Sequence, residues 1–363
     1  MFIGICGSIC AGKRTIASYL ADHHGFTHLY LVSSPTKNTV TQAAATPPSS
    51  ASIKSTSSSA QTVFSTPEEL LEFVTKRWQD RFVTTDIPSE EILDIYTRRP
   101  FFLLLSVDAP LTVRWKRFLA RQSSQNNHGR FLKGPNEESE PQDEVTDLES
   151  FVTLNDTHLY DPVNGIQAMI SRGTVRLLNT SPSLAHLYAT LGKLDLLNQD
   201  RLRPSWDAYF MALASLAAQR ANCMKRRVGC VIVRDKRVIS TGYNGTPRGL
   251  VNCGEGGCER CNAGQGSGHG LTTCLCIHAE ENALLEAGRE RVREGAVLYC
   301  TTHPCLTCSI KIVQVGISEV VYSHGYSMDG DTAAVLREAG VKLRQYVAPA
   351  NGLVHLEKLD LYK

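Results

Sequence analysis

Short apolar runs alternate with amphipathic stretches over residues 1–200. An apolar run at residues 2–6 leads into a glycine-containing turn, and residues 15–20 then have the composition of a helix. The runs RFVTTD (81–86) and FFLLLSV (101–107) have the unbroken apolar character of strands that are buried on both faces, as in parallel sheets. Strands that alternate with helices after a glycine-rich first loop predict a doubly wound α/β domain.

The pattern begins again near residue 200, which divides the chain into two domains. Pro204 is followed by SWDAYFMALASLAAQR, a long predicted helix with apolar residues on one face. We therefore expect a first domain over 1–200, a second over 201–349 and a C-terminal tail over 350–363.

Two polar stretches interrupt the first domain. The first, at about 34–65, is rich in Ser, Thr, Ala and Pro, and the second, at about 123–149, is rich in polar and acidic residues. Neither offers enough apolar surface to offset the chain entropy lost on folding, so we expect disordered insertions.

Length and composition fit a globular protein of the cell interior. With 363 residues and 42% hydrophobic content, the chain can bury two cores. Its longest apolar run, residues 101–105, is far too short to span a bilayer, and the N-terminus lacks the features of a signal peptide. The formal net charge of +2 lacks the basic surplus of a protein whose main partner is nucleic acid. We expect no membrane and no nucleic-acid partner, and a cytoplasmic location with a nuclear pool left open.

Cysteine has the most uneven distribution of any residue type in the chain. Of the twelve cysteines, two lie in the first 222 residues and ten lie between Cys223 and Cys308. In a reducing compartment such clustering favours metal binding over disulfides. Cys230 and Cys300 lie inside apolar runs of strand type, so we expect them to be buried thiols without a metal.

The segments CIHAEENALLEAG (276–288) and CTTHPCLTCSIKIVQVG (300–316) contain a candidate metal site. His278 stands at the start of one predicted helix. Cys305 and Cys308 stand at the start of another, where their spacing places both sulfurs on one face of the first turn. Two thiolates and one imidazole are three zinc ligands, which leaves the fourth tetrahedral position for water and predicts a catalytic zinc.

Glu280 follows His278 by two residues and is close enough to hydrogen-bond that water without binding the metal. An HxE motif followed by PCxxC is typical of the zinc nucleoside and nucleobase deaminases. In such an enzyme Glu280 takes a proton from water, delivers it to ring N3 and passes another to the leaving amine, while hydroxide attacks C4 of cytosine. The alternative is a structural zinc site in which Glu280 is an ordinary first-turn residue. The coincidence of both motifs at this spacing argues against it.

Residues 206–346 resemble the deoxycytidylate (dCMP) deaminases, most of all their fungal form. The resemblance rests on both metal-binding segments and on SWDAYFMALA, RRVGCVIVRDKRVISTGYNGTPRG and EAGVKLRQY. It implies a cytidine-deaminase-like α/β/α sandwich around a mixed five-stranded sheet. Five apolar, β-branched runs stand where its strands are expected: VGCVIV, VISTGYN, AVLYCT, EVVYS and VKLRQY.

The same resemblance implies the reaction and its control. The reaction is zinc-dependent hydrolysis of dCMP to dUMP and ammonia, which supplies dUMP for thymidylate synthesis. The family is a homo-oligomer, expected as a hexamer, that dCTP activates and dTTP inhibits. Whether Mg²⁺ accompanies the triphosphate is left open. Asn244, in the turn GYNGTPRG, is the predicted contact to sugar or base, and Tyr326 a predicted contact to the substrate phosphate. The alternative for GYNGTPRG is an ordinary turn without a ligand contact, and the alternative for Tyr326 is a surface tyrosine.

A second zinc is predicted from the cysteines that the first site leaves unassigned. These are Cys223, Cys253, Cys258, Cys261, Cys274 and Cys276. Residues 252–276 have little apolar content, so a structural metal would explain how the segment holds a shape. Resemblance to some phage and microbial deaminases implies Cys223, Cys253 and Cys276 as ligands. The fourth is left open between the other three cysteines and His269, and unliganded buried thiols are the alternative.

The stretch GSICAGKRT (7–15) resembles a phosphate-binding loop. Gly7, Gly12 and Lys13 fit a loop that holds phosphate on backbone amides and a lysine. Arg14, however, stands where the pattern has the Ser or Thr that binds Mg²⁺, and Thr15 comes one residue late. The domain resembles small nucleotide kinases such as dephospho-coenzyme A kinase. We expect a degenerate P-loop kinase-like domain that stabilises, assembles or regulates the second domain.

Three other functions are left open by the sequence. The first is deamination of another base, in cytidine, tRNA adenosine, guanine or a riboflavin precursor, since the same zinc chemistry serves several bases. The second is a nucleotide kinase with an accessory deaminase domain. The third is a zinc-stabilised interaction module without catalysis.

Overall fold

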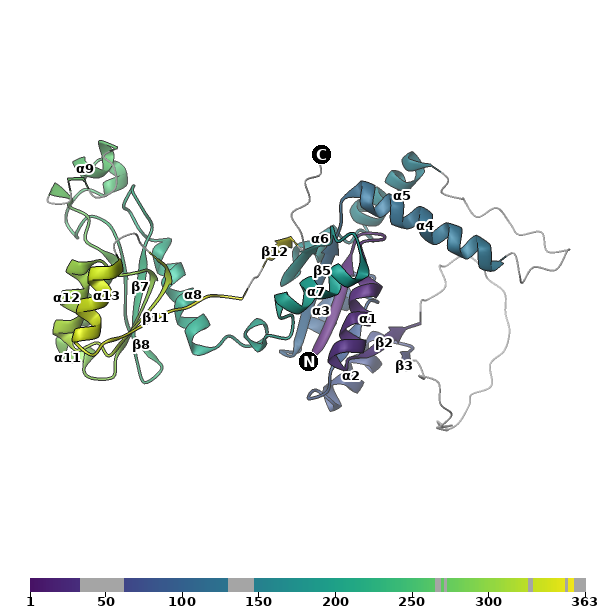
Figure 1. Ribbon diagram of the computed structural model, residues 1–363, viewed down its shortest axis with the longest axis horizontal. Coiled ribbons are helices and arrows are strands. Elements are labelled where there is room, and N and C mark those ends of the chain that lie inside the picture. The colour runs from purple at the N-terminus through teal and green to yellow at the C-terminus, as the bar shows by residue number, and fades with distance from the viewer. Residues whose placement is uncertain are drawn as a thin grey trace. The chain divides into compact units, whose positions relative to one another are not determined.

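The computed structural model describes residues 1–32, 62–129, 147–264, 269–270, 273–325, 329–349 and 352–355. The chain forms two compact units, Met1–Leu202 together with Ala350–Lys363, and Arg203–Pro349. Each unit is built on one sheet with helices against it (Figure 1). In the described part of the chain, no helix combines the length and the apolar character that a membrane crossing requires.

The two expected insertions lie mostly outside the described residues. Their described edges belong to regular elements: residues 62–64 form a strand, residues 123–129 continue a helix, and another helix begins at Leu148. The limits 34–65 and 123–149 are therefore wrong at these edges. Polar side chains do not prevent backbone hydrogen bonding, which is what extends the strand and the helix there.

The first unit alternates strands and helices along the chain. Its strands are β1 (Phe2–Gly7), β2 (Thr27–Leu31), β3 (Thr62–Phe64), β4 (Phe82–Thr84), β5 (Phe102–Asp108), β6 (Val175–Leu178) and β12 (Gly352–His355). Its helices are α1 (Lys13–His24), α2 (Pro67–Lys76), α3 (Glu90–Thr97), α4 (Leu111–Gly129), α5 (Leu148–Tyr160), α6 (Gln167–Ser171), α7 (Leu184–Leu194) and the 3₁₀ turn η1 (Gln199–Arg201).

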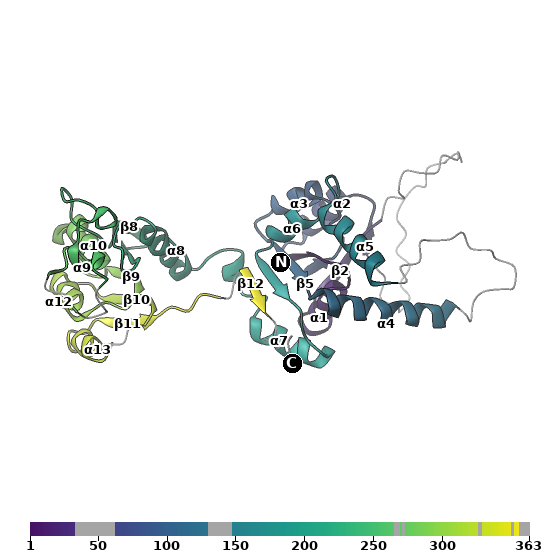
Figure 2. The ribbon, with the colours of Figure 1, turned by 90° about the horizontal axis from the view of Figure 1, so that it is seen from above.

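All strands of the first unit pair in parallel, in the order β12-β6-β5-β1-β4-β2-β3. Both faces of β1 are buried: Ile3 and Ile5 pack with α1 and α7, whereas Phe2 and Cys6 pack in a second core that includes residues of α2 and α3. Figure 2 shows these two pairs of helices on opposite sides of the sheet. The continuous apolar runs seen in the sequence are therefore strands between two helical layers.

Part of the predicted C-terminal tail, 350–363, is a strand of the first unit. Residues 352–355 are strand β12, which pairs in parallel with β6 and extends the sheet of the first unit. The run GLVH is too short to predict a strand on its own. It is held by backbone pairing to a strand that precedes it by about 170 residues, which no local pattern shows.

The second unit is a mixed five-stranded sheet between helices, as its expected fold class requires. Its strands are β7 (Gly229–Arg234), β8 (Arg237–Tyr243), β9 (Val297–Thr302), β10 (Glu319–His324) and β11 (Lys342–Gln345). Its helices are α8 (Trp206–Ala218), α9 (Glu259–Asn262), α10 (Ala279–Ala287), α11 (Arg289–Val292), α12 (Leu306–Val315), α13 (Asp329–Glu338) and the 3₁₀ turn η2 (Cys253–Glu255).

The strand order of this sheet is β11-β10-β9-β7-β8, with β7 antiparallel to both neighbours and β9, β10 and β11 parallel. Cys230 and Ile232 face the core made with α10 and α12, whereas Val231 and Val233 face the core made with α8. Figures 1 and 2 show α8 on one side of the sheet and α12 on the other. Cys230 and Cys300 are fully buried partners on β7 and β9, as expected for thiols without a metal.

Helix α10 lies very close to β8 because the strand has a glycine where they cross. A Cβ atom on Gly242 would lie 2.1 Å from the carbonyl oxygen of Ala279 and 2.4 Å from the nitrogen of Ala283. Two side chains fasten the same contact: Ser240 Oγ donates to the carbonyl of Ala283 at 2.8 Å, and Asn282 Nδ2 donates to the carbonyl of Tyr243 at 2.8 Å. These contacts with β8 thereby fix the position of the first turn of α10 on the sheet.

We predict that Gly242→Ala lowers the free energy of unfolding by about 1–3 kcal/mol or more, because the added methyl group overlaps the helix backbone. Gly330→Ala is the matched control, since nothing lies within 4 Å of its Cβ position in α13. Alanine in a helix should leave stability unchanged or raise it. Urea titrations of the two variants would measure this. Equal stability of Gly242→Ala and the native protein would contradict the close contact.

Candidate active site and metal centres

The candidate zinc ligands lie at the starts of two helices. Gly245 and Ile277 exchange backbone hydrogen bonds of 3.2 and 2.9 Å, which fixes the chain just before His278. His278 is the N-cap residue of α10, and Cys305 is the N-cap residue of α12, shortly after β9 ends. Neither side chain caps its own helix through a hydrogen bond, so both are available as ligands. Cys308 lies in the first turn of α12.

These three predicted ligands converge. The Sγ atoms of Cys305 and Cys308 each lie 3.4 Å from Nδ1 of His278, and the three donor atoms all lie within 4.8 Å of one another. Hydrogen bonds with Cys308 and His278 lower the pKa of Cys305 to about 3, which makes it a thiolate at neutral pH. Two sulfurs and one imidazole nitrogen fit the donor set of a catalytic zinc.

Glu280 lies in the first turn of α10 beside these ligands. It is almost completely buried, with 4% of its surface exposed. Burial raises the pKa of its carboxyl group to about 7, and a hydrogen bond to the backbone of Glu280 and the charge of His278 oppose this rise. A carboxyl group of this kind can both take up and release a proton near neutral pH, as general acid–base catalysis needs.

An ion pair joins the two helices that hold the site. Lys311 Nζ of α12 lies 2.5 Å from a carboxylate oxygen of Glu281 in α10. Both side chains are partly exposed, so we expect the pair to add no more than about 1 kcal/mol. Glu281 is therefore turned toward α12, whereas its neighbour Glu280 is buried with the ligands.

Asn244 is buried and holds a backbone turn. Its Oδ1 accepts the N–H of Val228 at 2.8 Å, and its Nδ2 donates to the carbonyl of Arg226 at 2.7 Å. The amide retains one N–H and one lone pair for a ligand, so its contact to substrate stays a prediction. Tyr326, the other predicted contact, lies outside the described residues.

A second asparagine, which no sequence pattern singled out, orders the same region. Asn222 Oδ1 accepts the N–H of Thr246 at 3.0 Å, and its Nδ2 donates to Oδ1 of Asn252 at 2.9 Å. It thus joins the turn after β8 to the start of the cysteine-rich segment. A polar residue after a predicted helix gives no sequence signal for such a role, apart from its position next to Cys223.

The six remaining clustered cysteines also converge. Among the described residues their sulfurs form two groups of four within 4.8 Å of one another: Cys223, Cys253, Cys261 and Cys276, and Cys258, Cys261, Cys274 and Cys276. The three ligands implied by resemblance thus lie together with Cys261, and His269 belongs to neither group. All six are free thiols, and four Sγ–Sγ distances are 3.9 Å, against about 2.05 Å in a disulfide.

The predicted phosphate loop follows β1 and contains two glycines with positive φ angles. Gly7 and Gly12 have φ angles of 141° and 109°, a region that favours glycine. Lys13 Nζ donates to the carbonyl oxygens of Gly7 and Ser8 at 2.7 and 2.9 Å. Burial lowers the pKa of Lys13 to about 8. Arg14 points to the exposed side of α1.

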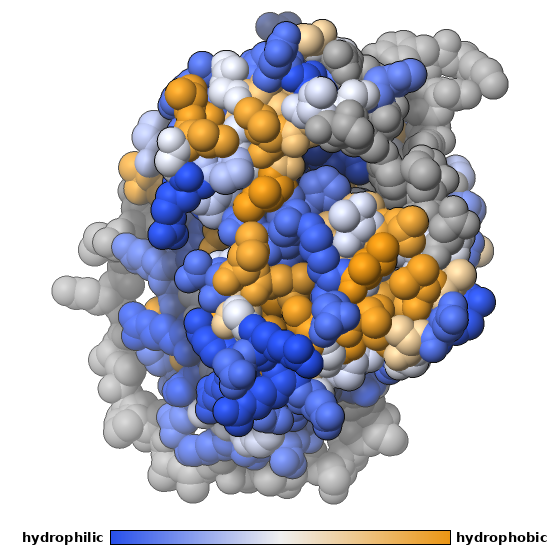
Figure 3. All heavy atoms as spheres, turned by 90° about the vertical axis from the view of Figure 1, so that its left-hand side faces the viewer, coloured by the Kyte–Doolittle hydropathy of each residue, from blue (hydrophilic) through white to orange (hydrophobic). Residues whose placement is uncertain are grey.

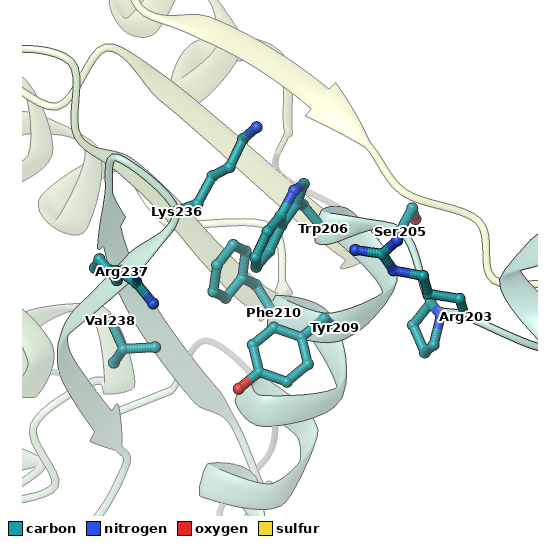
Figure 4. Close-up of a pocket in the computed structure, with 9 residues that line it drawn as sticks. Arg203, Ser205, Trp206, Tyr209, Phe210, Lys236, Arg237 and Val238 are labelled. Atoms are coloured by element: carbon teal, nitrogen blue, oxygen red, sulfur yellow. The ribbon is translucent and has the colours of Figure 1, made fainter. Parts of the chain in front are cut away.

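A separate hollow of about 630 Å³ lies at the other end of β8. Figure 4 shows its lining: the side chains of Trp206, Tyr209 and Phe210 from α8, facing Lys236 and Arg237 at the turn between β7 and β8. β8 runs from Arg237 to Tyr243, so its ends are about 20 Å apart. The hollow is therefore distinct from the zinc ligands, which lie beyond the Tyr243 end.

The fold and the site define a class. The five-stranded mixed sheet, with His278, Glu280, Cys305 and Cys308 at its helix starts, is that of a zinc-dependent deaminase. In agreement, residues 204–324 match the family model described as the cytidine and deoxycytidylate deaminase zinc-binding region. The expected fold of this unit and its catalytic zinc are thereby confirmed.

Comparison with whole proteins narrows this class. The chain is 44% identical over 351 residues to the deoxycytidylate deaminase of Schizosaccharomyces pombe, covering 97% of this chain and 99% of that protein. It is 46% identical over 291 residues to the deoxycytidylate deaminase of Saccharomyces cerevisiae, covering 77% and 86%. A deoxycytidylate deaminase of Mycobacterium phage D29 is 46% identical over 125 residues, which are 33% of this chain and 95% of that protein. The chain belongs to the deoxycytidylate deaminase family, and it is a hydrolase acting on C–N bonds.

Proposed function

We propose that the protein catalyses zinc-dependent hydrolytic deamination of dCMP to dUMP and ammonia. One observation carries the proposal: three zinc ligands from two helix starts converge beside a buried glutamate, in a chain of the deoxycytidylate deaminase family. The rival substrates cytidine, tRNA adenosine, guanine and a riboflavin precursor need the same zinc chemistry. What favours the nucleotide is the similarity over almost the whole chain to proteins named for dCMP.

The chain's own residues have distinct parts in this reaction. His278, Cys305 and Cys308 would hold the zinc ion, whose Lewis acidity would lower the pKa of water toward about 7 and so supply hydroxide at neutral pH. Glu280 takes the proton from water and delivers it to N3 of the ring, which makes C4 electrophilic. Hydroxide adds to C4, and Glu280 takes up the proton of the added hydroxyl group and passes it to the amino group. The C4–N bond then breaks, which leaves the C4 carbonyl of dUMP and ammonia. Because Glu280 is almost completely buried, bulk solvent is kept away from these proton transfers.

We expect Glu280→Gln to lower kcat for dCMP by at least about 100-fold, the usual contribution of a general acid–base, without loss of zinc. Glu281→Gln is the matched control, because the neighbouring carboxylate pairs with Lys311 and should leave kcat within a few-fold of the native value. Ammonia release from dCMP, CMP, cytidine and tRNA would be measured together with zinc per chain. A native protein that does not turn over dCMP would overturn the proposed substrate. An active Glu280→Gln would overturn the mechanism and favour a non-catalytic zinc module.

We further propose that the enzyme is a homo-oligomer, in keeping with the hexamer expected from the family, with dCTP as activator and dTTP as inhibitor. Exposed apolar side chains on α10 and α12 support an oligomer: Leu285, Leu306 and Ile310 are 70%, 44% and 55% exposed. Leu306 and Ile310 are four residues apart on α12 and so share one side of it. Figure 3 shows apolar side chains gathered over this face of the second unit.

We predict that Ile310→Lys reduces the oligomer to smaller species, because a charge would be buried at the interface. Val163→Lys, at an 85% exposed position of the first unit, should leave the mass unchanged. Light scattering after size-exclusion chromatography would give the mass, and assays with dCTP and dTTP the regulation. A native protein that stays monomeric at tens of micromolar would contradict the proposed oligomer. Turnover that neither dCTP nor dTTP changes would contradict the proposed regulation.

We propose that the first unit is a degenerate P-loop kinase-like domain, which binds a nucleotide phosphate and does not transfer it. The turn at residues 7–13 supports binding, because its glycines permit the loop conformation and Lys13 is held against it. The lack of a hydroxyl at position 14, where an exposed arginine stands, argues against Mg²⁺-dependent catalysis.

We expect Lys13→Ala to weaken binding of ATP by at least about 10-fold, since a buried cation at the phosphate is lost. Lys116→Ala, an exposed lysine of α4, should bind as the native protein does. Calorimetric titration would measure affinity, and phosphate transfer to nucleoside monophosphates would be assayed in parallel. Transfer that Lys13→Ala abolishes would make the unit a kinase and overturn its degenerate character.

We also propose a second, structural zinc held by the cluster of six cysteines. Its support is the convergence of six thiols in a segment with little other core: among the described apolar side chains, those that pack in the cluster around Cys253, Cys258 and Cys261 are the other three cysteines of the set.

A further inference from the structure

The six-cysteine cluster contains more sulfur than one zinc ion can bind. A structural zinc takes four ligands, but two different groups of four are already assembled within 4.8 Å. The groups overlap in Cys261 and Cys276 and differ in their other members. A single ion in either group would leave two further thiols packed against its ligands.

The sulfur spacing fits two adjoining tetrahedra. Zinc–sulfur bonds of about 2.3 Å place the sulfurs of one tetrahedron about 3.8 Å apart. In one group, Cys261 lies 3.9 Å from Cys223 and 3.9 Å from Cys276. In the other, Cys274 lies 3.9 Å from both Cys258 and Cys261. Cys261 therefore has the sulfur–sulfur spacing of a zinc tetrahedron with members of both groups.

We propose that the six cysteines bind two zinc ions, and that the thiolates of Cys261 and Cys276 bridge them. Cys223 and Cys253 complete one tetrahedron, and Cys258 and Cys274 complete the other. This deepens the proposed structural zinc and rests on it: the site is binuclear, and the whole chain holds three zinc ions with the catalytic one.

The charge of this arrangement is no larger than that of an ordinary structural site. Two Zn²⁺ ions and six thiolates have a net charge of −2, the same as one Zn²⁺ with four thiolates. The six thiols release six protons to solvent as the two ions bind, so metal and proton balance without a redox step.

Surrounding groups donate to these sulfurs in the way that metal-bound thiolates require. The backbone N–H of Met224 lies 3.4 Å from Cys253 Sγ, and backbone N–H groups of Lys225 and Arg226 donate to Cys223. Arg260 Nη1 donates to Cys274 Sγ at 3.6 Å. Such donors offset the negative charge of the sulfurs.

Neither disulfide bonds nor a plain hydrophobic core accounts for the cluster. Disulfides are ruled out among the pairs at 3.9 Å, which are far longer than an S–S bond. A hydrophobic core does not account for the cluster either. Among the described residues, the apolar cluster consists of the six cysteines and contains no aliphatic or aromatic side chain. Six small thiols bury too little apolar area to order a glycine-rich segment.

The cluster is also placed to affect catalysis. Cys276 precedes His278 by two residues, and Ile277 between them is held by the backbone bridge to Gly245. A bridging ligand at Cys276 therefore fixes the chain that enters α10. Loss of the cluster should lower zinc binding by His278 indirectly, although no cluster residue touches the substrate chemistry described above.

Zinc per chain, measured by mass spectrometry on the full-length protein, tests the proposal. We expect three in the native protein, two in His278→Ala and three in the control Cys10→Ser, whose thiol lies in the first unit. Two zinc ions in the native protein would overturn the binuclear site and leave one structural zinc. One zinc ion would overturn the structural zinc too. Neither result would touch the deaminase proposal, which the dCMP assay decides separately.

Substituting one non-bridging ligand in each proposed tetrahedron distinguishes a binuclear from a mononuclear site. Cys223→Ser and Cys258→Ser should each lower zinc content below three, because each removes a ligand from a different ion. A mononuclear site would respond to only one of them. Should either variant fail to fold, native protein loaded with ¹¹³Cd still answers: bridging thiolates give cluster resonances with ¹¹³Cd–¹¹³Cd coupling. Uncoupled cluster resonances would overturn the bridge.

Discussion

Three donor atoms from two helices have to meet around one ion, and the second unit is arranged around that requirement. The ligands belong to the starts of α10 and α12, which are more than twenty residues apart in the chain. The ligands meet because both helices are held at fixed positions on the sheet. Gly242 allows α10 to lie directly against β8, since any larger residue would push the helix away. The end of β9 fixes where α12 starts.

Electrostatic interactions explain how this site can hold negatively charged ligands and a carboxyl group that exchanges protons. Two thiols and a carboxyl group gather beside one imidazole, where burial by itself would oppose negative charge. Helix N-termini offer partial positive charge to the same atoms, and a divalent cation offsets what remains. Among the described residues, Glu280 is not part of the group of donor atoms that would hold the metal, so its carboxyl group is available to move protons in the proposed reaction. The arrangement that binds the metal is therefore also the one that tunes the catalytic carboxyl group.

The two units hold different sets of candidate residues. In the first, the backbone of the glycine loop and the part-buried Lys13 are compatible with the proposed phosphate binding, while position 14 carries an arginine and no hydroxyl. In the second, the full set of ligands and the proton carrier is present. The terminal strand β12 returns to the first sheet after the second unit is complete, so the first unit is built from two segments of the chain and the second from one continuous segment.

The amino-acid sequence predicted the zinc ligands, Glu280 as the proton carrier and the two α/β units. It could do so because HxE and PCxxC are local motifs whose spacing follows from helix geometry, and because strands buried on both faces are apolar throughout. The folded structure was needed to show that Cys261 and Cys276 each belong to two groups of sulfurs and that β12 joins a sheet begun at Phe2. It was also needed to show that Asn244 is hydrogen-bonded to backbone groups of Arg226 and Val228. These are contacts between residues distant along the chain, set by how layers pack, and no local pattern of residues encodes them.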